Sequence, residues 1–160
     1  MENKNGIRLA YLPPDPAVVA EVAGWHHLEW SHFSQRTLTD RIREFDEHLS
    51  QEAEPLTVLA WQDSKPVGSA SLLVHDMEIH PDWSPWLGSV YVLPSHRERG
   101  IGSMLCQQIE QEARRLGKER IYLYTPDRAP FYQRMGWNLL EEIEYKGEQV
   151  TLMDKVLVRD

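Results

Sequence analysis

The chain has 160 residues, 41% of them hydrophobic, and a formal net charge of −8 at pH 7. This length is typical of one domain with a sizeable core, which we expect to span residues 1–160. The acidic balance argues against DNA or RNA as a partner and weakly favours a cationic, amine-bearing one. No apolar run approaches the ~18 residues of a transmembrane helix, and Met1–Asn5 lacks the apolar stretch of a signal peptide. With a single cysteine, Cys106, the sequence predicts a cytoplasmic protein.

The periodicity of apolar residues predicts alternating helices and strands. A strand is expected over 7–11, and Asp15 and Pro16 suit the N-cap and first position of a helix that runs to about residue 30. Thr39 is predicted to cap a second helix. The remaining elements are expected to be strands over 56–61, 67–74 and 86–93, a helix from 101 to 116, a strand over 120–124, a short helix over 127–135, and a closing hairpin of 138–145 and 149–158. This order indicates an α/β or α+β fold around a mixed sheet.

The most informative segment is the turn Arg97-Glu98-Arg99-Gly100-Ile101-Gly102, between a predicted strand and a predicted helix. A strand that turns into a helix directs several backbone N–H groups at one spot beside the positive end of the helix. Gly100 and Gly102 let a ligand approach that backbone closely. The spacing fits neither a Walker loop nor a Gly-x-Gly-x-x-Gly fingerprint. The turn therefore predicts a different kind of phosphate-binding site.

The spacing Arg97-x-x-Gly100-x-Gly102 resembles the acetyl-coenzyme A signature of the GNAT acetyltransferase superfamily. A second segment, residues 129–137, resembles the superfamily's Ala-x-x-Phe-Tyr-x-x-x-Gly-aromatic motif, and the two together cover residues 86–137. The resemblance implies a mixed, mostly antiparallel twisted sheet that is splayed after its fourth strand. About four helices would flank this sheet, with the cofactor in the split.

The resemblance also implies which residues hold acetyl-coenzyme A as the co-substrate. The strand backbone would pair with the pantetheine amides, and the turn would hold the pyrophosphate. The expected cofactor-binding residues are Val90, Tyr91, Val92, Arg97, Glu98, Arg99, Gly100, Ile101, Gly102 and Ser103. The alternative for the two arginines is that they are solvated surface side chains.

Tyr132 is the candidate general acid. A phenol with a pKa near 10 is protonated at neutral pH and can donate to a leaving thiolate, and the resemblance puts Tyr132 near the thioester sulfur. The alternative is a core tyrosine packed against Phe131 and Trp137. Cys106 lies among apolar residues and is predicted to be a buried structural thiol rather than a nucleophile.

The sequence departs from the superfamily's pattern at two places. Residues 125–127 read Thr-Pro-Asp where many relatives have an asparagine that contacts the cofactor, and residues 88–89 read Gly-Ser where many have a glutamate as general base. A water chain could remove the proton instead. Asp76, Glu78 and His80, in the preceding loop, are the other candidates for the base, with solvated loop residues as the alternative.

A cluster of polar and aromatic residues closes the first predicted helix, where the resemblance places one wall of the acceptor site. The expected acceptor-binding residues are Trp25, His26, Glu29, Trp30, Asp76 and Glu78. Plain helix packing is the alternative for the helical members. The histidines there lack a cysteine or a second ligand pair for zinc, so no metal is predicted.

The resemblance thus implies an N-acetyltransferase that moves an acetyl group to a primary amine by direct attack in a ternary complex. The acceptor would be a small-molecule amine or a protein N-terminus, with no nucleic acid or membrane involved, and a homodimer is compatible with this. The alternatives are a non-catalytic acyl-coenzyme A-binding sensor or assembly domain, and a nucleotide-binding regulatory module. Thioester turnover distinguishes the enzyme from both. The sequence leaves the acceptor, the acyl chain length and the oligomeric state open.

Overall fold

The computed structural model describes residues 6–157, so the predictions for residues 1–5 and for Val158 lie outside the described part of the chain. In chain order this part forms β1 (Ile7–Tyr11), α1 (Pro16–Trp30), α2 (Leu38–Asp46), β2 (Leu56–Gln62), β3 (Lys65–Leu73), β4 (Trp86–Val92), the 3₁₀ helix η1 (Pro94–His96), α3 (Ile101–Arg115), β5 (Arg120–Thr125), α4 (Ala129–Arg134), β6 (Asn138–Tyr145) and β7 (Glu148–Val156). The predicted order of helices and strands is confirmed, and η1 is an addition to it.

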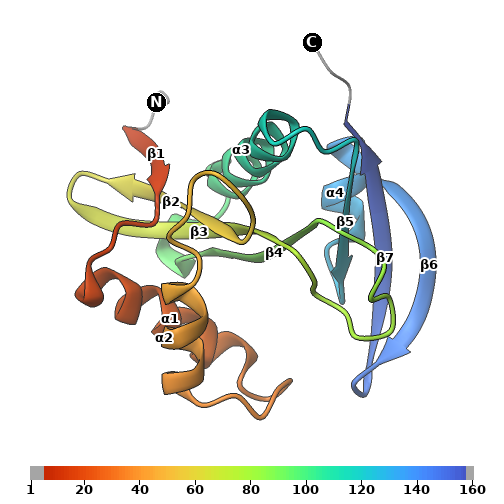
Figure 1. The fold of residues 1–160 in the computed structure, drawn as a ribbon, viewed down its shortest axis with the longest axis horizontal. Helices are drawn as coiled ribbons and strands as arrows, with labels where there is room; N and C mark the ends of the chain where they lie inside the picture. Colours follow the sequence, from red (N-terminus) through yellow and green to blue (C-terminus); the bar gives the residue numbers. More distant parts are fainter. Residues whose placement is uncertain (1–5, 158–160) are drawn as a thin grey trace.

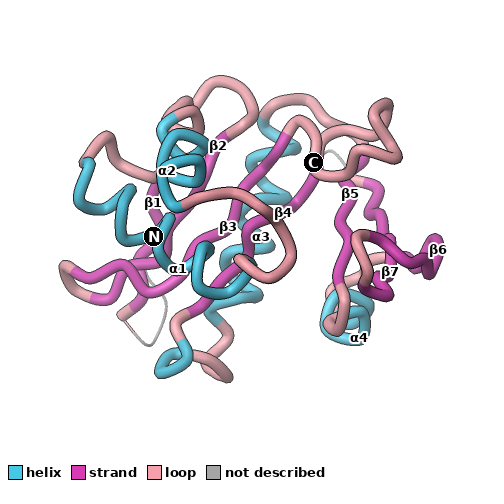
Figure 2. The backbone as a smooth tube through the Cα atoms, turned by 90° about the horizontal axis from the view of Figure 1, so that it is seen from below, coloured by secondary structure: helices cyan, strands magenta, loops and turns pink. Residues whose placement is uncertain are grey.

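The seven strands form one sheet in the order β1-β2-β3-β4-β5-β7-β6. Each pair of neighbours is antiparallel except β4 and β5, which are parallel and meet at Trp86 and Tyr122. Beyond this point β4 and β5 diverge, so the sheet opens into two halves, which Figures 1 and 2 show from two directions. The predicted mixed, mostly antiparallel sheet that is splayed after its fourth strand is confirmed.

Helices cover both faces of the first half of the sheet (Figure 1). Successive side chains of a strand point to opposite faces, so Val58 and Ala60 of β2 pack in one core with α3, whereas Leu59 packs in another with α1. Apolar residues recur three and four positions apart along α3, and its buried stripe includes Ile101, Leu105 and Ile109. The sheet and α3 therefore hold the strand β4 and the start of α3 in a fixed relation.

Two predicted helix starts need correction or adjustment. The N-cap of α2 is Thr37 rather than Thr39, because Thr37 Oγ1 accepts from the Asp40 N–H and the Asp40 carboxylate accepts from the Thr37 N–H, at 3.1 and 2.9 Å. This reciprocal pair needs an acidic residue three positions after the cap. The short helix predicted over 127–135 is confined to Ala129–Arg134. By contrast, the predicted cap Asp15 is confirmed, since its carboxylate accepts from the Ala17 N–H.

Candidate functional site

A bulge distorts β4 where the sheet opens. Ser69 of β3 pairs with Tyr91 and Ser71 pairs with Gly88, so one residue of β3 opposes two residues of β4. Ser89, inside the bulge, has a φ of 53°, in the left-handed region. Bulges of this kind bend a strand and re-aim its backbone groups. The side of β4 turned away from β3 thereby becomes an open edge that faces the gap toward β5.

The N-terminus of α3 presents free backbone donors to the same gap. Its N-cap is Gly100, with a φ of 81° that favours glycine. The first helical hydrogen bond runs from the Met104 N–H to the Gly100 carbonyl at 3.1 Å, so the N–H groups of residues 101–103 precede the helical ladder. Glycine has no side chain that could cap them. This end of α3 is therefore a positively polarised site with the geometry that anions bind.

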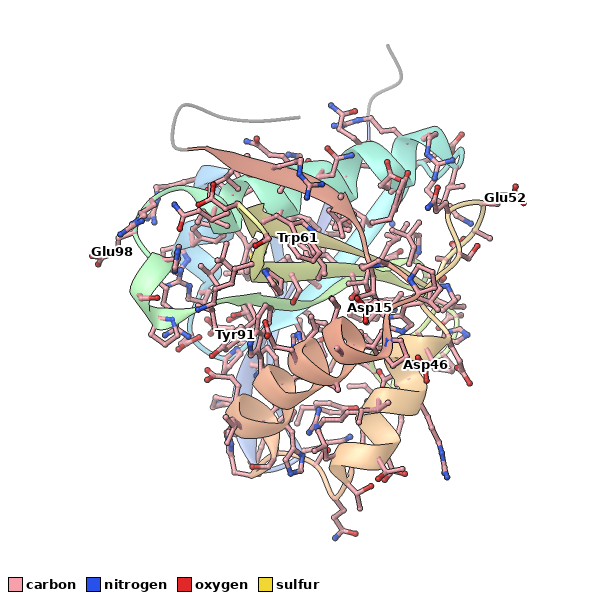
Figure 3. The ribbon with its side chains drawn as sticks, turned by 90° about the vertical axis from the view of Figure 1, so that its left-hand side faces the viewer. Asp15, Asp46, Glu52, Trp61, Tyr91 and Glu98 are labelled. Atoms are coloured by element: carbon pink, nitrogen blue, oxygen red, sulfur yellow. The ribbon has the colours of Figure 1, made fainter. Side chains whose placement is uncertain are left out.

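At this turn the backbone N–H groups face the gap, whereas the side chains of Arg97 and Glu98 point elsewhere. Arg97 folds back on β4, where its Nε donates to the Val92 carbonyl at 2.9 Å and its guanidinium lies 5.5 Å from the Tyr91 ring centre. Glu98 points away from the body of the protein, while Tyr91 lies beside α1 (Figure 3). A ligand that paired along β4 would compete with Arg97 for the Val92 carbonyl.

One continuous cleft of about 1330 Å³ runs between the two halves of the sheet. We call one end the turn half, which is lined by 90–92 and by the turn that leads into α3. The other end, the hairpin half, is lined by Glu29, Trp30, His32, Phe33, Arg36, Glu44, Asp76, Tyr124, Lys146, Glu148 and Gln149. Tyr132 also lines this cleft. A single cavity thus joins the anion-type site at α3 to a cluster of charged and aromatic side chains.

The structure brings most of the predicted site residues together in this cleft. Of the predicted cofactor residues, all but Arg99 line it. Of the predicted acceptor residues, His26, Glu29, Trp30 and Asp76 line it. Trp25 and Glu78, both in the described part of the chain, lie elsewhere: Trp25 is buried and stacks on Tyr91 at 5.7 Å, and Glu78 is exposed.

His26 is a buried member of the cleft wall with a defined hydrogen-bond chain. Its Nε2 lies 2.9 Å from Ser69 Oγ, which donates in turn to the Ser89 carbonyl at 3.2 Å. Burial lowers the pKa of His26 to about 3, with smaller contributions from Arg41 and His48. His26 is therefore neutral at neutral pH, and the chain ties α1 through β3 to the bulge of β4.

Tyr132 is held at the start of the second motif by local structure. Thr125 Oγ1 accepts from the Arg128 N–H at 3.0 Å just before α4, which places Tyr132 one turn into the helix. The Tyr132 hydroxyl donates a hydrogen bond to the Cys106 sulfur. Burial raises the pKa of Tyr132 well above its ordinary value, so the phenol stays protonated at neutral pH.

Cys106 is buried, as predicted. Burial, aided by the charge of Glu110, raises the pKa of its thiol to about 12. The thiolate is the reactive form of cysteine, so this residue is a poor nucleophile at neutral pH.

The hairpin half contains charges that come from separate segments. Arg36 and Glu44 form an ion pair, His32 Nε2 lies 3.4 Å from a Glu148 carboxylate oxygen, and Lys146 Nζ lies 5.4 Å from the Tyr145 ring centre. Sequence reasoning missed the lining residues Arg36, Glu44, Tyr124, Lys146 and Glu148. Their one signal was the tight turn at 146–147, where charged residues flank a tyrosine. Nothing local showed that this hairpin lies beside the connection between α1 and α2.

Metal and membrane features are absent from the part that the structure describes. Within residues 6–157, no group of three or more His, Cys, Asp or Glu side chains is placed to hold a metal ion. No helix of these residues has both the length and the apolar composition needed to cross a membrane.

Comparisons with known proteins agree with this geometry. One similar solved structure is yncA, a putative acetyltransferase from Salmonella typhimurium with its cofactor acetyl-CoA; the two chains are 17% identical over 98% of this chain and 96% of that chain, with a TM-score of 0.75. A second is an aminoglycoside 6'-N-acetyltransferase complexed with coenzyme A, at 16% identity over 96% of this chain and 98% of that chain, with a TM-score of 0.77. A third is the aminoglycoside 6'-N-acetyltransferase from Enterococcus faecium, at 16% identity over the same shares of the two chains, with a TM-score of 0.76. No curated protein matches significantly. The model of the acetyltransferase (GNAT) family matches residues 22–137, well over half of the chain. The chain therefore belongs to the GNAT acetyltransferase family.

Proposed function

We propose that this protein is an N-acetyltransferase that moves the acetyl group of acetyl-coenzyme A to a primary amine by direct attack in a ternary complex. The observation that carries the proposal is the single cleft that joins the polarised N-terminus of α3 to the charged and aromatic hairpin half. Such a cleft can hold a phosphorylated thioester and a second molecule at the same time. Two of the similar structures hold acetyl-CoA or coenzyme A, which supports this choice of thioester.

The residues of the turn half fit the phosphates and the pantetheine of this co-substrate. The N–H groups of 101–103 would bind the pyrophosphate. A Cβ on Gly102 would have its nearest neighbours, Phe131 and Val92, at 3.9 Å, so the space above this backbone is open. The open edge of β4 over 90–92 offers carbonyl and N–H groups for the pantetheine amides, strand to strand. Bound there, the co-substrate supplies a thioester that an amine can attack.

Tyr132 would protonate the departing thiolate. It lines the cleft, and its raised pKa keeps it protonated at neutral pH. The hydrogen bond to Cys106 fixes the hydroxyl in the free enzyme. Proton donation to a leaving group of this kind typically contributes ~10²–10⁴-fold to the rate.

The lining of the hairpin half favours a small cationic amine as the acceptor. It has the carboxylates of Glu29, Glu44 and Glu148, with Asp76 as a further acidic group, against the two cations Arg36 and Lys146. An excess of negative charge in a cleft attracts cations. Aminoglycoside acetyltransferases among the similar structures agree with this class. A protein N-terminus is the second acceptor class, which the same charge would also attract.

An acceptor screen tests the proposal. Purified protein with acetyl-coenzyme A would be incubated with small amines, amino acids, aminoglycosides and peptides, and the free thiol would be measured. We expect thiol release that depends on the amine. Tight binding of acetyl-coenzyme A without amine-dependent thiol release would favour a sensor or assembly domain instead. Preference for a nucleotide that lacks pantetheine would favour a regulatory nucleotide-binding module.

A further inference from the structure

A carboxylate from the β3–β4 loop occupies the side-chain space of a glycine on β4. A Cβ built on Gly88 would lie 2.9 Å from Asp76 Oδ2 and 2.7 Å from Leu73 Cδ1, closer than real Cβ contacts. Gly88 and Asp76 both line the cleft. The absence of a side chain at position 88 therefore lets the Asp76 carboxylate reach the strand just before the bulge. The Asp76 carboxylate lies in the cleft wall where the sheet begins to open.

Charged groups from three other elements face this carboxylate. They are Glu44 of α2, Arg36 of the α1–α2 connection and Lys146 of the β6–β7 turn. The charge of Asp76 also raises the pKa of the Tyr124 phenol on β5. Arg36 is already paired with Glu44. None of the ion pairs found within residues 6–157 involves Asp76. Asp76 is thus a half-buried carboxyl group that no neighbouring cation holds in its charged form.

Burial, and next the charge of Glu44, raises the pKa of Asp76 to about 8, while Arg36 and Lys146 oppose the shift. A group with a pKa near neutrality can both take up and release a proton during turnover. Partial desolvation of a carboxylate without an ion-pair partner is costly, so a purely structural residue at this position would be expected to have a partner. The free-energy cost of leaving this carboxylate without a partner is explained if the carboxylate acts on a ligand.

We propose that Asp76 is the general base that takes a proton from the ammonium group of the incoming amine. This inference rests on the proposed function and adds a catalytic residue to it. Asp76 becomes a neutral acid and the amine becomes neutral. The amine nitrogen then forms a bond to the thioester carbon, and the carbon–sulfur bond breaks. Tyr132 gives its proton to the thiolate and regains one from the attacking nitrogen through solvent. Asp76 loses its proton to solvent, so one proton is released per turnover.

Three other titratable side chains near the cleft fit this role less well. His26 is neutral down to low pH, and its Nε2 is engaged with Ser69. Glu78, two residues from Asp76, is exposed and lies outside the cleft lining of the described chain. Cys106 is buried and stays a thiol. Asp76 combines a place in the hairpin half with a carboxylate that reaches β4 at Gly88 and a raised pKa.

The experiment compares Asp76→Asn and Asp76→Glu with wild type and with the matched control Asp82→Asn, an exposed residue of the same loop. Thiol release is measured with kanamycin, 1,4-diaminobutane and glycine amide, which carry protonated primary amines. It is also measured with hydroxylamine, which is largely unprotonated at neutral pH. We expect Asp76→Asn to lose ~10²-fold or more in kcat with the protonated amines. We expect a much smaller loss with hydroxylamine, partial activity in Asp76→Glu and full activity in Asp82→Asn.

The pH profile and the folded state give two further readouts. In wild type, kcat/KM should rise with pH up to about 8, and this limb should disappear in Asp76→Asn. At neutral pH the variant should melt at about the same temperature as wild type and bind coenzyme A equally well, because the amide replaces a carboxyl group that is largely protonated there. Equal rates of wild type and Asp76→Asn, or an unchanged pH limb, would overturn the assignment of Asp76 alone. No amine-dependent thiol release by wild type would overturn the proposed function, and the assignment with it.

Discussion

The two halves of the cleft are built in different ways. The turn half consists of backbone: the open edge of β4 and the first N–H groups of α3, within one short stretch of chain. The hairpin half consists of side chains from five separate segments, between Glu29 on α1 and Gln149 on β7. Backbone donors carry no charge that titrates, whereas the hairpin half contains several titratable side chains. The first arrangement suits a constant ligand such as a phosphate, and the second can vary to suit an acceptor.

Tyr132→Phe should have the largest effect, because Tyr132 serves the chemistry that both halves bring together. The change removes one proton donor but keeps the ring that packs against Phe131 and Trp137. We expect kcat to fall by ~10²–10⁴-fold. Steady-state kinetics with an acceptor from the screen would measure this.

Affinity for coenzyme A and the melting temperature serve as controls for Tyr132→Phe, and both should stay close to wild type. A near wild-type turnover number would show that Tyr132 is a packing residue. Water or another group would then protonate the thiolate.

Gly102→Val tests whether the backbone of the turn half holds the pyrophosphate, and it should have the next largest effect. Gly102 is the second residue of α3, and its nearest neighbours are 3.9 Å from a Cβ, so the side chain fits the free protein. It would, however, stand in the space proposed for the pyrophosphate. We expect the Kd for coenzyme A, measured by calorimetry, to rise by ~10–100-fold, or about 1.4–2.8 kcal/mol.

Gly24→Ala is the matched control for Gly102→Val. Gly24 lies inside α1 with nothing within 4 Å of a Cβ, so the change adds helix propensity without touching the cleft. Both variants should fold at least as well as wild type. Unchanged affinity in a folded Gly102→Val protein would show that the pyrophosphate is held elsewhere.

The contrast between the halves also explains what the sequence could predict. Two glycines at motif spacing, a strand before them and a helix after them are local features, so most residues that line the turn half were predictable. The hairpin half depends on which loops meet across the split sheet, and a pair such as Arg36 with Glu44 leaves no local pattern. Asp76 was visible only as one of several loop residues. What sets Asp76 apart is that its carboxylate lies where a side chain at position 88 would stand, which only the folded chain shows.

Stability as a function of pH should reflect Asp76 of the hairpin half and two buried histidines, His26 and His48. Burial lowers the pKa of His26 to about 3 and that of His48 to about 4, so below pH ~6.5 the unfolded chain binds more protons and stability falls with falling pH. Asp76 has the opposite sign. Its pKa is raised to about 8, so the folded chain binds more protons and stability rises as the pH falls toward the ordinary carboxyl range.

Asp76→Asn separates these two trends. Between pH ~7.5 and ~6 we expect its free energy of unfolding to fall by about 1–2 kcal/mol through the two histidines. Wild type should stay about level, because the contribution of Asp76 has the opposite sign and a similar size over this range. Urea unfolding at each pH would measure the difference. Parallel curves for the two proteins would mean that Asp76 has an ordinary pKa.

Cys106→Ala should have the smallest effect, although Cys106 contacts the proposed acid. Direct transfer needs no acylated enzyme, and the buried thiol stays protonated at neutral pH. The change removes one sulfur atom from the core, which should cost about 1 kcal/mol of stability. It also removes the hydrogen-bond acceptor of the Tyr132 hydroxyl in the free enzyme, whereas Cys106→Ser keeps one. Since the thiolate of the product would accept the same proton during turnover, we expect kcat to stay within ~3-fold of wild type in both variants. Mass spectrometry of the enzyme during turnover is the decisive measurement, because an acetyl group trapped on Cys106 would replace direct attack by a two-step mechanism.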